Sequence, residues 1–345
     1  MSIETQSTGR RKWSYPQAEF ARMYAPLEKL HPAMKLRALL KAKFLARRAD
    51  PARCFLHTAG AYDAMTAALL TDIGFEAVYA SGSQLAVARN MYPDLGLYPS
   101  HQMVELVREL QRGIEGARDR GFYDGGGEIL HTPPIFADIE AGFGGPAQIF
   151  ALAREFIKAG AAGVRLEDRI ENLTAVKAAS QAMECPLVVI ARTDSIDRAL
   201  EAASLGVDVI CPEFSDTSLD APRRFAEGVH AHYPDQILGF NLSPSLHWGR
   251  AKREGRLPTN RELGELGYTL QFSTLLAFRT TGMALETWLT GFQRRGLDAL
   301  ADLQLVETAS LDGEPRTRLH QKFAGTDRWL HIERRSRTFE PVEAA

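Results

Sequence analysis

The chain has 345 residues, of which 45% are hydrophobic and 24% are charged, and its formal net charge is −2. A charge so close to neutral argues against a nucleic-acid binder and against a protein of the membrane surface, while the apolar fraction is typical of a globular protein with a sizeable core. No apolar run approaches the roughly 18 residues of a membrane span, and the first residues lack the apolar centre of a signal peptide. The three cysteines, Cys54, Cys185 and Cys211, show neither a metal-binding spacing nor an even count for disulfides, so we expect a cytoplasmic protein.

Residues 1–50 are expected to form an N-terminal extension with a basic amphipathic helix at 31–48, which could bind a membrane or a partner, or could pack on the body of the protein. From residue 54 onward, short β-type runs alternate with helical patterns such as "AQIFALAREFIKAGA", which end near glycine. The runs are β-branched or aromatic and mostly apolar on both faces, as parallel strands covered on both sides must be. They occupy residues 54–60, 77–82, 132–140, 163–168, 186–194, 208–214, 236–244 and 268–274.

Eight strands, each followed by enough chain for a helix, predict an α/β fold with a TIM-type (β/α)8 barrel over residues 51–305. A doubly wound parallel sheet is the alternative. Residues 306–345 are expected to form a C-terminal extension, in which "RTRLHQKFAGTDRWLHIERRSR" (316–337) predicts a β-hairpin around Gly325. We expect this extension to pack between subunits.

Nearly every strand run ends in polar or small residues, and "IFADIEAGFGG" (135–145) is the most informative of these ends. Active sites of (β/α)8 barrels lie at the carboxyl ends of the strands, where such residues meet. Asp138 and Glu140 stand two apart and therefore point to the same side of a strand. Further acids follow the other strands, namely Glu167 or Asp168, Asp194 and Glu213. Oxygen ligands without a Cys/His cluster favour Mg²⁺ or Mn²⁺ over zinc, although these acids could instead cap the following helices.

Seven segments in chain order carry a resemblance to a known family: "YASGSQLAVA", "MYPDLGLYP", "ADIEAGFGG", "AGAAGVRLEDR", "VVIARTDS", "FNLSPSLHW" and "LQFSTLLAF". Together they resemble the isocitrate lyase / phosphoenolpyruvate mutase superfamily, and isocitrate lyase in particular. The resemblance implies a barrel crossed by its N-terminal helix, and a homotetramer whose subunits exchange the last barrel helix. It also implies a small carboxylate as partner, with neither nucleic acid nor membrane. The implied chemistry makes or breaks C–C or C–P bonds next to a carboxylate, with Mg²⁺ holding a 2-oxo acid or its enolate.

The resemblance also implies a set of site residues. Asp138 matches the acid that ligates the metal directly, and three further acids match those that hold the metal's water shell: Asp94, Glu140 and Glu167. Arg192 matches the arginine that binds substrate and helps neutralise the enolate. The matches to the substrate-binding set are Ser81, Gly82 and Ser83 for the 2-oxo acid carboxylate, and Asn241, Ser243, Ser245 and Thr274 for the other carboxylates.

Cleavage of a 2-hydroxy acid leaves a carbanion, and a metal with an arginine can hold its aci-carboxylate form. Tyr79 matches a tyrosine near the bond that breaks and is an acid/base candidate, although it could also be a structural strand residue. We place Glu213 and His57 in the catalytic set with Arg192 and Tyr79.

The chain departs from the lyases of this family after its "LED" motif. In those enzymes a mobile loop close to "KKCGH" supplies a cysteine for acid/base catalysis. Here Asp168 and Arg192 are only 192 − 168 = 24 positions apart, and the sequence passes almost directly into a helix. Three residues could replace the cysteine, or could be structural: His57, expected near the carboxyl end of the first strand, His247 in "SPSLHW", and Cys211, two residues before Glu213.

The sequence therefore predicts an Mg²⁺-dependent C–C lyase that acts on a small 2-hydroxy di- or tricarboxylate without the usual loop cysteine. The alternative is a non-lyase or catalytically impaired family member that binds 2-oxo acids or associates with other family subunits. Leu242 and Leu246 make the substrate loop more apolar than is usual in the family, which favours a smaller or more apolar acid than isocitrate.

Overall fold

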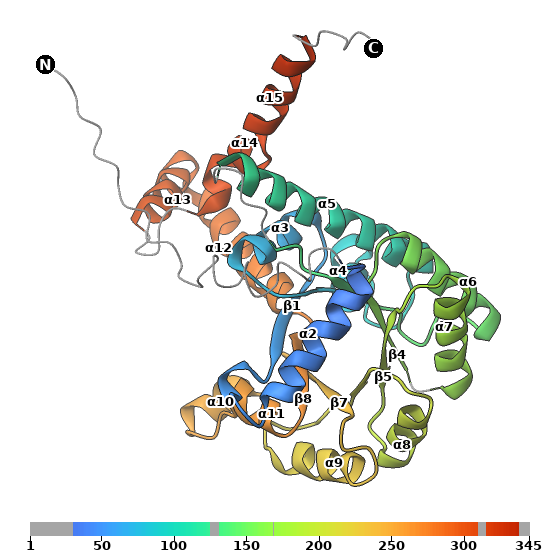
Figure 1. Cartoon of the computed structure of the whole chain (residues 1–345). Coiled ribbons are helices and arrows are strands. Elements are labelled where there is room, and N and C mark those ends of the chain that lie inside the picture. The colour runs from blue at the N-terminus through green and yellow to red at the C-terminus, as the bar shows by residue number, and fades with distance from the viewer. Residues whose placement is uncertain (1–29, 125–130, 168, 310–314, 338–345) are drawn as a thin grey trace, which may run out of the picture. The chain divides into compact units, whose positions relative to one another are not determined.

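The computed structural model describes residues 30–124, 131–167, 169–309 and 315–337, which fall into two compact units (Figure 1). The barrel unit comprises the described residues of 30–115 and 131–279. The C-terminal unit comprises residues 116–124, 280–309 and 315–337. The domain boundaries expected from the sequence, after residues 50 and 305, stay predictions.

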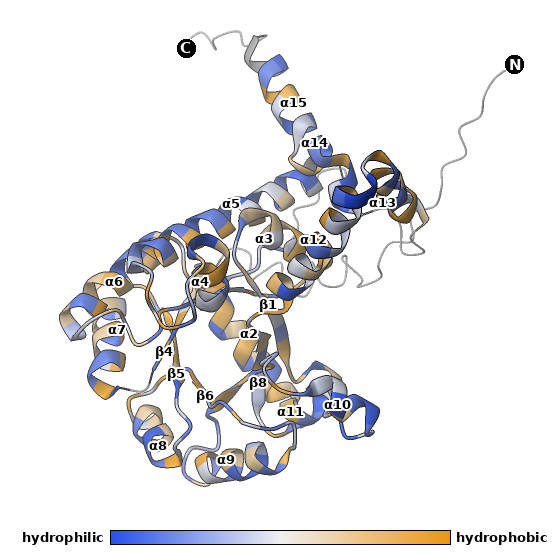
Figure 2. Ribbon diagram, turned by 180° about the vertical axis from the view of Figure 1, so that it is seen from behind, coloured by the Kyte–Doolittle hydropathy of each residue, from blue (hydrophilic) through white to orange (hydrophobic). Residues whose placement is uncertain are grey.

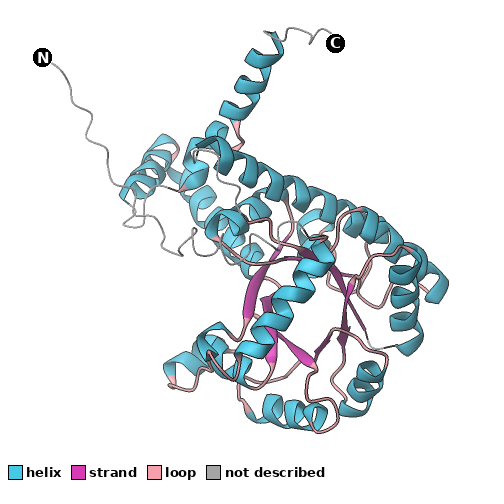
Figure 3. Ribbon diagram, viewed as in Figure 1, coloured by secondary structure: helices cyan, strands magenta, loops and turns pink. Residues whose placement is uncertain are grey.

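A closed barrel of eight parallel strands forms the centre of the barrel unit (Figure 3). Each strand pairs with the next one in sequence, and β8 closes the barrel on β1 with Leu56 opposite Leu270. The prediction of a (β/α)8 barrel is confirmed, and the doubly wound alternative is wrong. The strands are β1 Leu56–Ala61, β2 Val78–Ala80, β3 Ile135–Asp138, β4 Gly163–Glu167, β5 Val188–Arg192, β6 Val209–Cys211, β7 Ile237–Asn241 and β8 Tyr268–Ser273.

Helices follow the strands, and local sequence signals define several of their ends. Asp63 caps α3, because its Oδ1 accepts the N–H of Thr66 at 2.7 Å, and Gly74 ends the helix with a φ of +98°. Pro146 occupies the first turn of α6. The helices are α3 Ala64–Ile73, α4 Gly82–Asn90, α5 Ser100–Asp124, α6 Pro146–Lys158, α7 Ile170–Ala182, α8 Ile196–Ser204, α9 Asp220–His230, α10 Trp248–Arg253, α11 Asn260–Glu265 and α12 Leu276–Arg295.

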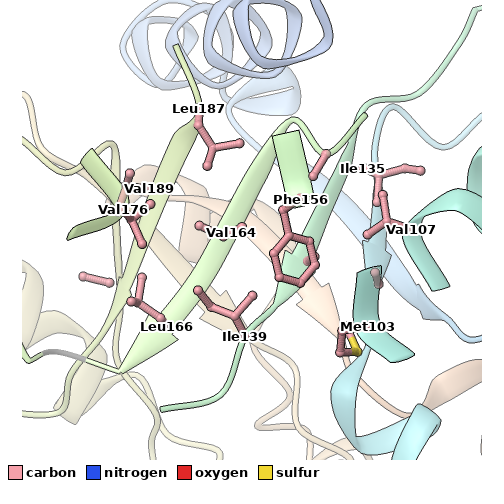
Figure 4. Packing of buried hydrophobic residues seen from close by; sticks show 14 of the residues in the cluster. Met103, Val107, Ile135, Ile139, Phe156, Val164, Leu166, Val176, Leu187 and Val189 are labelled. Carbon is pink, nitrogen blue, oxygen red and sulfur yellow. The ribbon is translucent and has the colours of Figure 1, made fainter. Parts of the chain in front are cut away.

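The hydrophobic core of the barrel unit lies between the strands and the helices that cover them. Figure 4 shows Val164 and Leu166 of β4 among residues from neighbouring strands and helices, including Phe156 of α6. The helices carry apolar residues inward and polar residues outward (Figure 2). Because successive strand residues point to opposite faces, Arg165, between Val164 and Leu166, points into the barrel interior.

A helix before the barrel, α2 Pro32–Ala46, closes the amino end of the barrel. It contacts β1, β5, β7 and β8 and buries Leu36, Leu39 and Leu40. Its basic residues bind groups that precede strands: Lys35 Nζ donates to the carbonyl of Thr132 at 2.6 Å, and Arg37 pairs with Asp208 at 2.7 Å. The basic helix expected at 31–48 therefore packs across the barrel.

The C-terminal unit contains helices where the sequence favoured a hairpin. Its elements after α12 are α13 Leu297–Ala309, η3 Arg316–Leu319, α14 His320–Phe323 and α15 Thr326–Arg337. The β-hairpin around Gly325 is therefore wrong: Gly325 has a φ of +82° and follows the end of α14, where a left-handed glycine commonly ends a helix. Arg328 pairs with Asp119 at 2.5 Å within this unit. Across the described ranges, no helix is both long and apolar enough to cross a membrane.

Candidate active site

A continuous chain of hydrogen bonds and ion pairs crosses the carboxyl end of the barrel from β2 to β7. It begins at Tyr79, whose hydroxyl donates to Asp138 Oδ2 at 2.6 Å. Both side chains are buried, and Tyr79 stacks on Phe136 and packs against Phe272, each with ring centroids 4.9 Å away. Burial, together with the charge of Asp138, raises the pKa of Tyr79 well above its ordinary value. The phenol therefore acts as a fixed donor that orients Asp138.

Arg165 continues the chain and is a site residue that the sequence reasoning missed. Its side chain is 5% exposed and lies 3.6 Å (Nη1) from Asp138 Oδ2 and 2.8 Å (Nη2) from Glu213 Oε1. The sequence does indicate this residue, because Arg165 is a charged residue among apolar ones in the middle of a strand, two positions before Glu167. A charge placed there points into the barrel and needs anionic partners.

Arg192, at the end of β5, is the arginine of this series of bonded residues that solvent reaches. Its Nη2 lies 3.1 Å from Glu213 Oε2 and its Nη1 lies 3.5 Å from Glu167 Oε1, while a third of its side chain is exposed. Asn241 also donates to Glu213 through Nδ2 at 3.4 Å. The Glu213 side chain is thus fixed by three donors from three different strands.

Two of the remaining predicted metal residues, Glu140 and Asp94, interact with Asp138, whereas Glu167 pairs with Arg192. Glu140 has a φ of +48°, which lets its backbone N–H donate to Asp138 Oδ1 at 3.1 Å. Its own carboxyl accepts the hydroxyl of Tyr98 at 2.9 Å, a second contact that the sequence reasoning missed. Burial and the charges of Asp138 and Asp94 raise the pKa of Glu140 to about 8. Burial and Asp138 also raise the pKa of Asp94, so these carboxylates crowd one another.

The predicted "SG" turn follows β2 and is fastened to the end of β8. Ser81 Oγ donates to the carbonyl of Thr274 at 3.1 Å and lies 3.2 Å from Ser83 Oγ. Gln84 donates to the same carbonyl, and its Oε1 accepts the N–H of Phe278 at 3.0 Å. Ser81, Ser83 and the Thr274 backbone therefore lie together, and their roles in binding substrate stay predictions.

Gly82 makes room for the acid cluster. A Cβ at this position would lie 2.5 Å from both Glu140 Oε1 and the Tyr98 hydroxyl. The absence of a side chain at Gly82 therefore permits the Tyr98–Glu140 hydrogen bond.

The loop after β7 carries the predicted residues Ser243 and Ser245. Ser243 Oγ accepts the N–H of Ser245 at 3.3 Å, and the Ser243 carbonyl accepts Trp248 Nε1 at 2.7 Å. An open hollow beside this loop is lined by Pro244, Leu246, His247, Trp248, Gly249, Arg250, Arg253 and Arg279. Its three arginines give the rim of this loop a positive charge.

Two of the proposed replacements for the loop cysteine lie away from the acid cluster. His57 is the second residue of β1, near the amino end rather than the expected carboxyl end, and its ring lies 5.4 Å from that of Phe75. The expected position of His57 is wrong because the strand starts at Leu56 and extends to Ala61. His247 is exposed on the loop after β7. Cys211 is fully buried, and burial raises the pKa of its thiol to about 11, which makes it a poor acid at neutral pH.

The connection from β4 to α7 is too short to form a lid. β4 ends at Glu167 and α7 begins at Ile170, with Arg169 at its N-terminal cap. Asp168 lies outside the described residues. The brief connection agrees with the short spacing seen in the sequence.

The acid cluster fits a hard divalent cation that keeps much of its water. Its donors are carboxylate oxygens, and burial together with neighbouring carboxylates raises the pKa values of Glu140 and Asp94, a negative charge that a cation would relieve. In the described part of the chain, no group of three or more His, Cys, Asp or Glu side chains is arranged to hold a metal directly. Mg²⁺ commonly uses one or two carboxylates and retains several waters, so Asp138, with Glu140 and Asp94 beside it, would suit as a direct ligand, and Glu167 stays a predicted member of the set.

Comparison with known proteins identifies the family. Residues 46–206 match the model of phosphoenolpyruvate phosphomutase, and residues 195–337 match the model of the isocitrate lyase family. An isocitrate lyase of Halalkalibacterium halodurans is 29% identical over an alignment of 364 positions, which covers 85% of this chain and 85% of the relative.

Two solved structures share the fold. A 2,3-dimethylmalate lyase is 20% identical with a TM-score of 0.65, covering 89% of this chain and 99% of the other. A phosphonopyruvate hydrolase in complex with oxalate and Mg²⁺ is 19% identical with a TM-score of 0.65, again covering 89% and 99%. The matched families and structures thus include lyases, a mutase and a hydrolase. The phosphonopyruvate hydrolase structure contains Mg²⁺ and the small carboxylate oxalate. This chain belongs to the phosphoenolpyruvate mutase / isocitrate lyase superfamily.

Proposed function

We propose that this protein is an Mg²⁺-dependent carbon–carbon lyase that cleaves a small 2-hydroxy di- or tricarboxylate through an enolate, or aci-carboxylate, intermediate. The observation that carries the proposal is the bonded chain from Tyr79 to Asn241, in which a crowded carboxylate cluster lies beside an accessible arginine. Such a site presents positive charge where a carbanion next to a carboxylate would form. When bound, Mg²⁺ would supply a Lewis acid to the 2-oxo acid oxygens.

Arg192 is the residue that we assign to the substrate carboxylate. It is accessible, and its contacts with Glu167 and Glu213 hold the guanidinium fork in place. A fork of this kind binds a carboxylate through two parallel hydrogen bonds.

Glu213 is the base that we assign to the substrate hydroxyl. Its carboxylate is one-third exposed and fixed by Arg165, Arg192 and Asn241, so it can accept the hydroxyl proton as the C–C bond breaks. Tyr79 is fully buried with its proton directed at Asp138, so we assign it an orienting role. His57 does not reach the mouth and is left out of the mechanism.

The polar turn after β2 and the loop after β7 are the proposed carboxylate receptors. Ser81, Gly82 and Ser83 would take the carboxylate of the 2-oxo acid, and Asn241, Ser243, Ser245 and Thr274 the remaining one. Arg279, which donates to the carbonyl of Pro244 at 2.8 Å, adds positive charge to this rim. Leu242 and Leu246 favour a methylated or otherwise apolar dicarboxylate, in line with the substrate named for the 2,3-dimethylmalate lyase.

We further propose a cytoplasmic homotetramer in which the α12 helix is exchanged. The three cysteines are free and buried, which suits a reducing compartment. No α12 residue is buried, although the helix carries apolar residues such as Met283, Leu289 and Phe292. An apolar helix without burial in its own chain favours a partner subunit.

The second candidate is a protein that binds 2-oxo acids without turnover. The observation that favours it is the two-residue passage from β4 to α7, which leaves no room for the loop that carries the family's usual acid.

A turnover screen separates the two candidates. Purified protein with Mg²⁺ would be assayed for release of 2-oxo acids from malate, 2-methylmalate, 2,3-dimethylmalate, isocitrate and 2-methylisocitrate, with Asp138→Asn as the control. We expect cleavage of a small or methylated dicarboxylate that EDTA abolishes. Oxalate binding without cleavage of any of these acids would favour the binding protein, and the absence of both would overturn both candidates.

A further inference from the structure

Arg165 is a permanent cation inside the barrel, next to the carboxylate that we assign to the metal. Its side chain is 5% exposed, so its charge is removed from water and depends on nearby anions for compensation. Its partners are the two acids on either side of it, Asp138 and Glu213.

Internal donors already occupy both oxygens of Asp138. Oδ2 accepts the hydroxyl of Tyr79 at 2.6 Å and lies 3.6 Å from Arg165 Nη1. Oδ1 accepts the backbone N–H of Glu140 at 3.1 Å. A divalent cation that approaches Asp138 therefore meets a carboxylate whose charge is partly neutralised.

Arg165 does not use all of its hydrogen-bond donors, and one of its two acidic partners has a second cation nearby. Its Nε is buried without a hydrogen-bond partner among the described residues, and Asn241 Oδ1 is in the same state. Glu213 has a second arginine, Arg192, 3.1 Å away, so it keeps a cationic partner without Arg165. Asp138 has no other guanidinium among the described ion pairs.

We propose that Arg165 is an internal counter-ion that competes with the divalent cation for Asp138. Arg165 neutralises the acid cluster when no metal is bound, and it lowers the affinity of the site for metal because two cations beside one carboxylate repel each other. The inference rests on the proposed function, which assigns Asp138 to the metal. Arg165 is then a positioning residue that acts through Asp138, and a bound divalent cation can take over its role as the positive charge beside that carboxylate.

Mn²⁺ binding, followed by the loss of the free-ion electron paramagnetic resonance signal, tests this proposal without any turnover. Arg165→Gln should bind Mn²⁺ at least about tenfold more tightly than wild type, which corresponds to about 1.4 kcal/mol. Arg165→Lys keeps the charge and should stay much closer to wild type. The melting temperature of Arg165→Gln should also rise more on addition of Mg²⁺, because the metal replaces the missing counter-ion.

Two control variants distinguish a general loss of stability and a wrong metal assignment from a wrong role for Arg165. Arg37→Gln removes an arginine that pairs with Asp208 at the amino end of the barrel, so it should lower stability without changing Mn²⁺ affinity. Asp138→Asn tests the metal assignment itself: unchanged Mn²⁺ binding in that variant would overturn the proposed metal site.

If Asp138→Asn weakens binding but Arg165→Gln binds Mn²⁺ no more tightly than wild type, only the competition is wrong. Should Arg165→Gln fail to fold, Arg165→Met fills a similar volume without charge and gives the same comparison. Failure of both variants to fold at saturating Mg²⁺ would also overturn the proposal, since the metal would then be unable to replace the guanidinium.

Discussion

Gly82→Ala offers the sharpest steric test of the acid cluster. Gly82 is the first residue of α4 and does not have a positive φ, so alanine is compatible with its backbone. The new Cβ would lie 2.5 Å from Glu140 Oε1 and from the Tyr98 hydroxyl, and 3.4 Å from Asp138 Cβ. Tyr98 is buried and cannot move freely, so the Tyr98–Glu140 bond of 2.9 Å should break. We expect the free energy of unfolding to fall by about 1–3 kcal/mol, the usual cost of overpacking.

Urea denaturation of the metal-free protein measures this change, and calorimetry with Mg²⁺ and oxalate measures its effect on the site. The matched control is Gly116→Ala in α5, where a Cβ meets nothing within 4 Å and the substitution should stabilise the helix by about 0.5–1 kcal/mol. If Gly82→Ala behaves like Gly116→Ala in both assays, the close approach of α4 to the acid cluster is wrong.

Three further predictions follow from the site. Arg192→Lys should weaken oxalate binding in Mg²⁺ by about 1–3 kcal/mol, because an ammonium cannot reproduce the bidentate fork; wild-type affinity would show that Arg192 points elsewhere. Since the pKa of Glu140 is raised to about 8, the folded metal-free protein holds a proton that the unfolded chain has lost, so stability should fall as pH rises from about 4.5 to 8, by up to about 1.4 kcal/mol per pH unit. Glu140→Gln should flatten this slope in urea titrations, and an unchanged slope would remove Glu140 as its cause. Isocitrate cleavage should be at least about a hundredfold slower than in a relative that has the cysteine loop, as expected for a lost general acid, and a turnover near 10 s⁻¹, roughly the median for enzymes, would refute this.

The barrel was predictable because each strand has its own local signal. Each of the eight runs identified from β-branched and apolar residues overlaps one strand. The acids at the ends of β3 and β4 and after β6 share two arginine partners because parallel strands end at the same mouth. The position of His57 was not predictable from composition, because the limits of an apolar run do not fix the limits of the strand inside it.

The hairpin prediction was wrong and Arg165 was overlooked, for different physical reasons. Gly325 suits both a hairpin turn and the end of a helix, and the aromatic and β-branched residues around it favoured the first. Arg165 was hidden because its partners, Asp138 and Glu213, come from distant parts of the chain. Strand alternation could have placed it inside the barrel, but only the folded structure shows which acids it meets.

Calorimetric titration of oxalate into the wild-type protein, with Mg²⁺ and after EDTA treatment, tests the central claim most directly, since oxalate is a small planar carboxylate that resembles the 2-oxo acid proposed to bind at the metal. We expect saturable binding with Mg²⁺, little or none without it, and loss of the Mg²⁺-dependent binding in Asp138→Asn. Equal oxalate affinity with and without Mg²⁺ would contradict the proposed metal-dependent site.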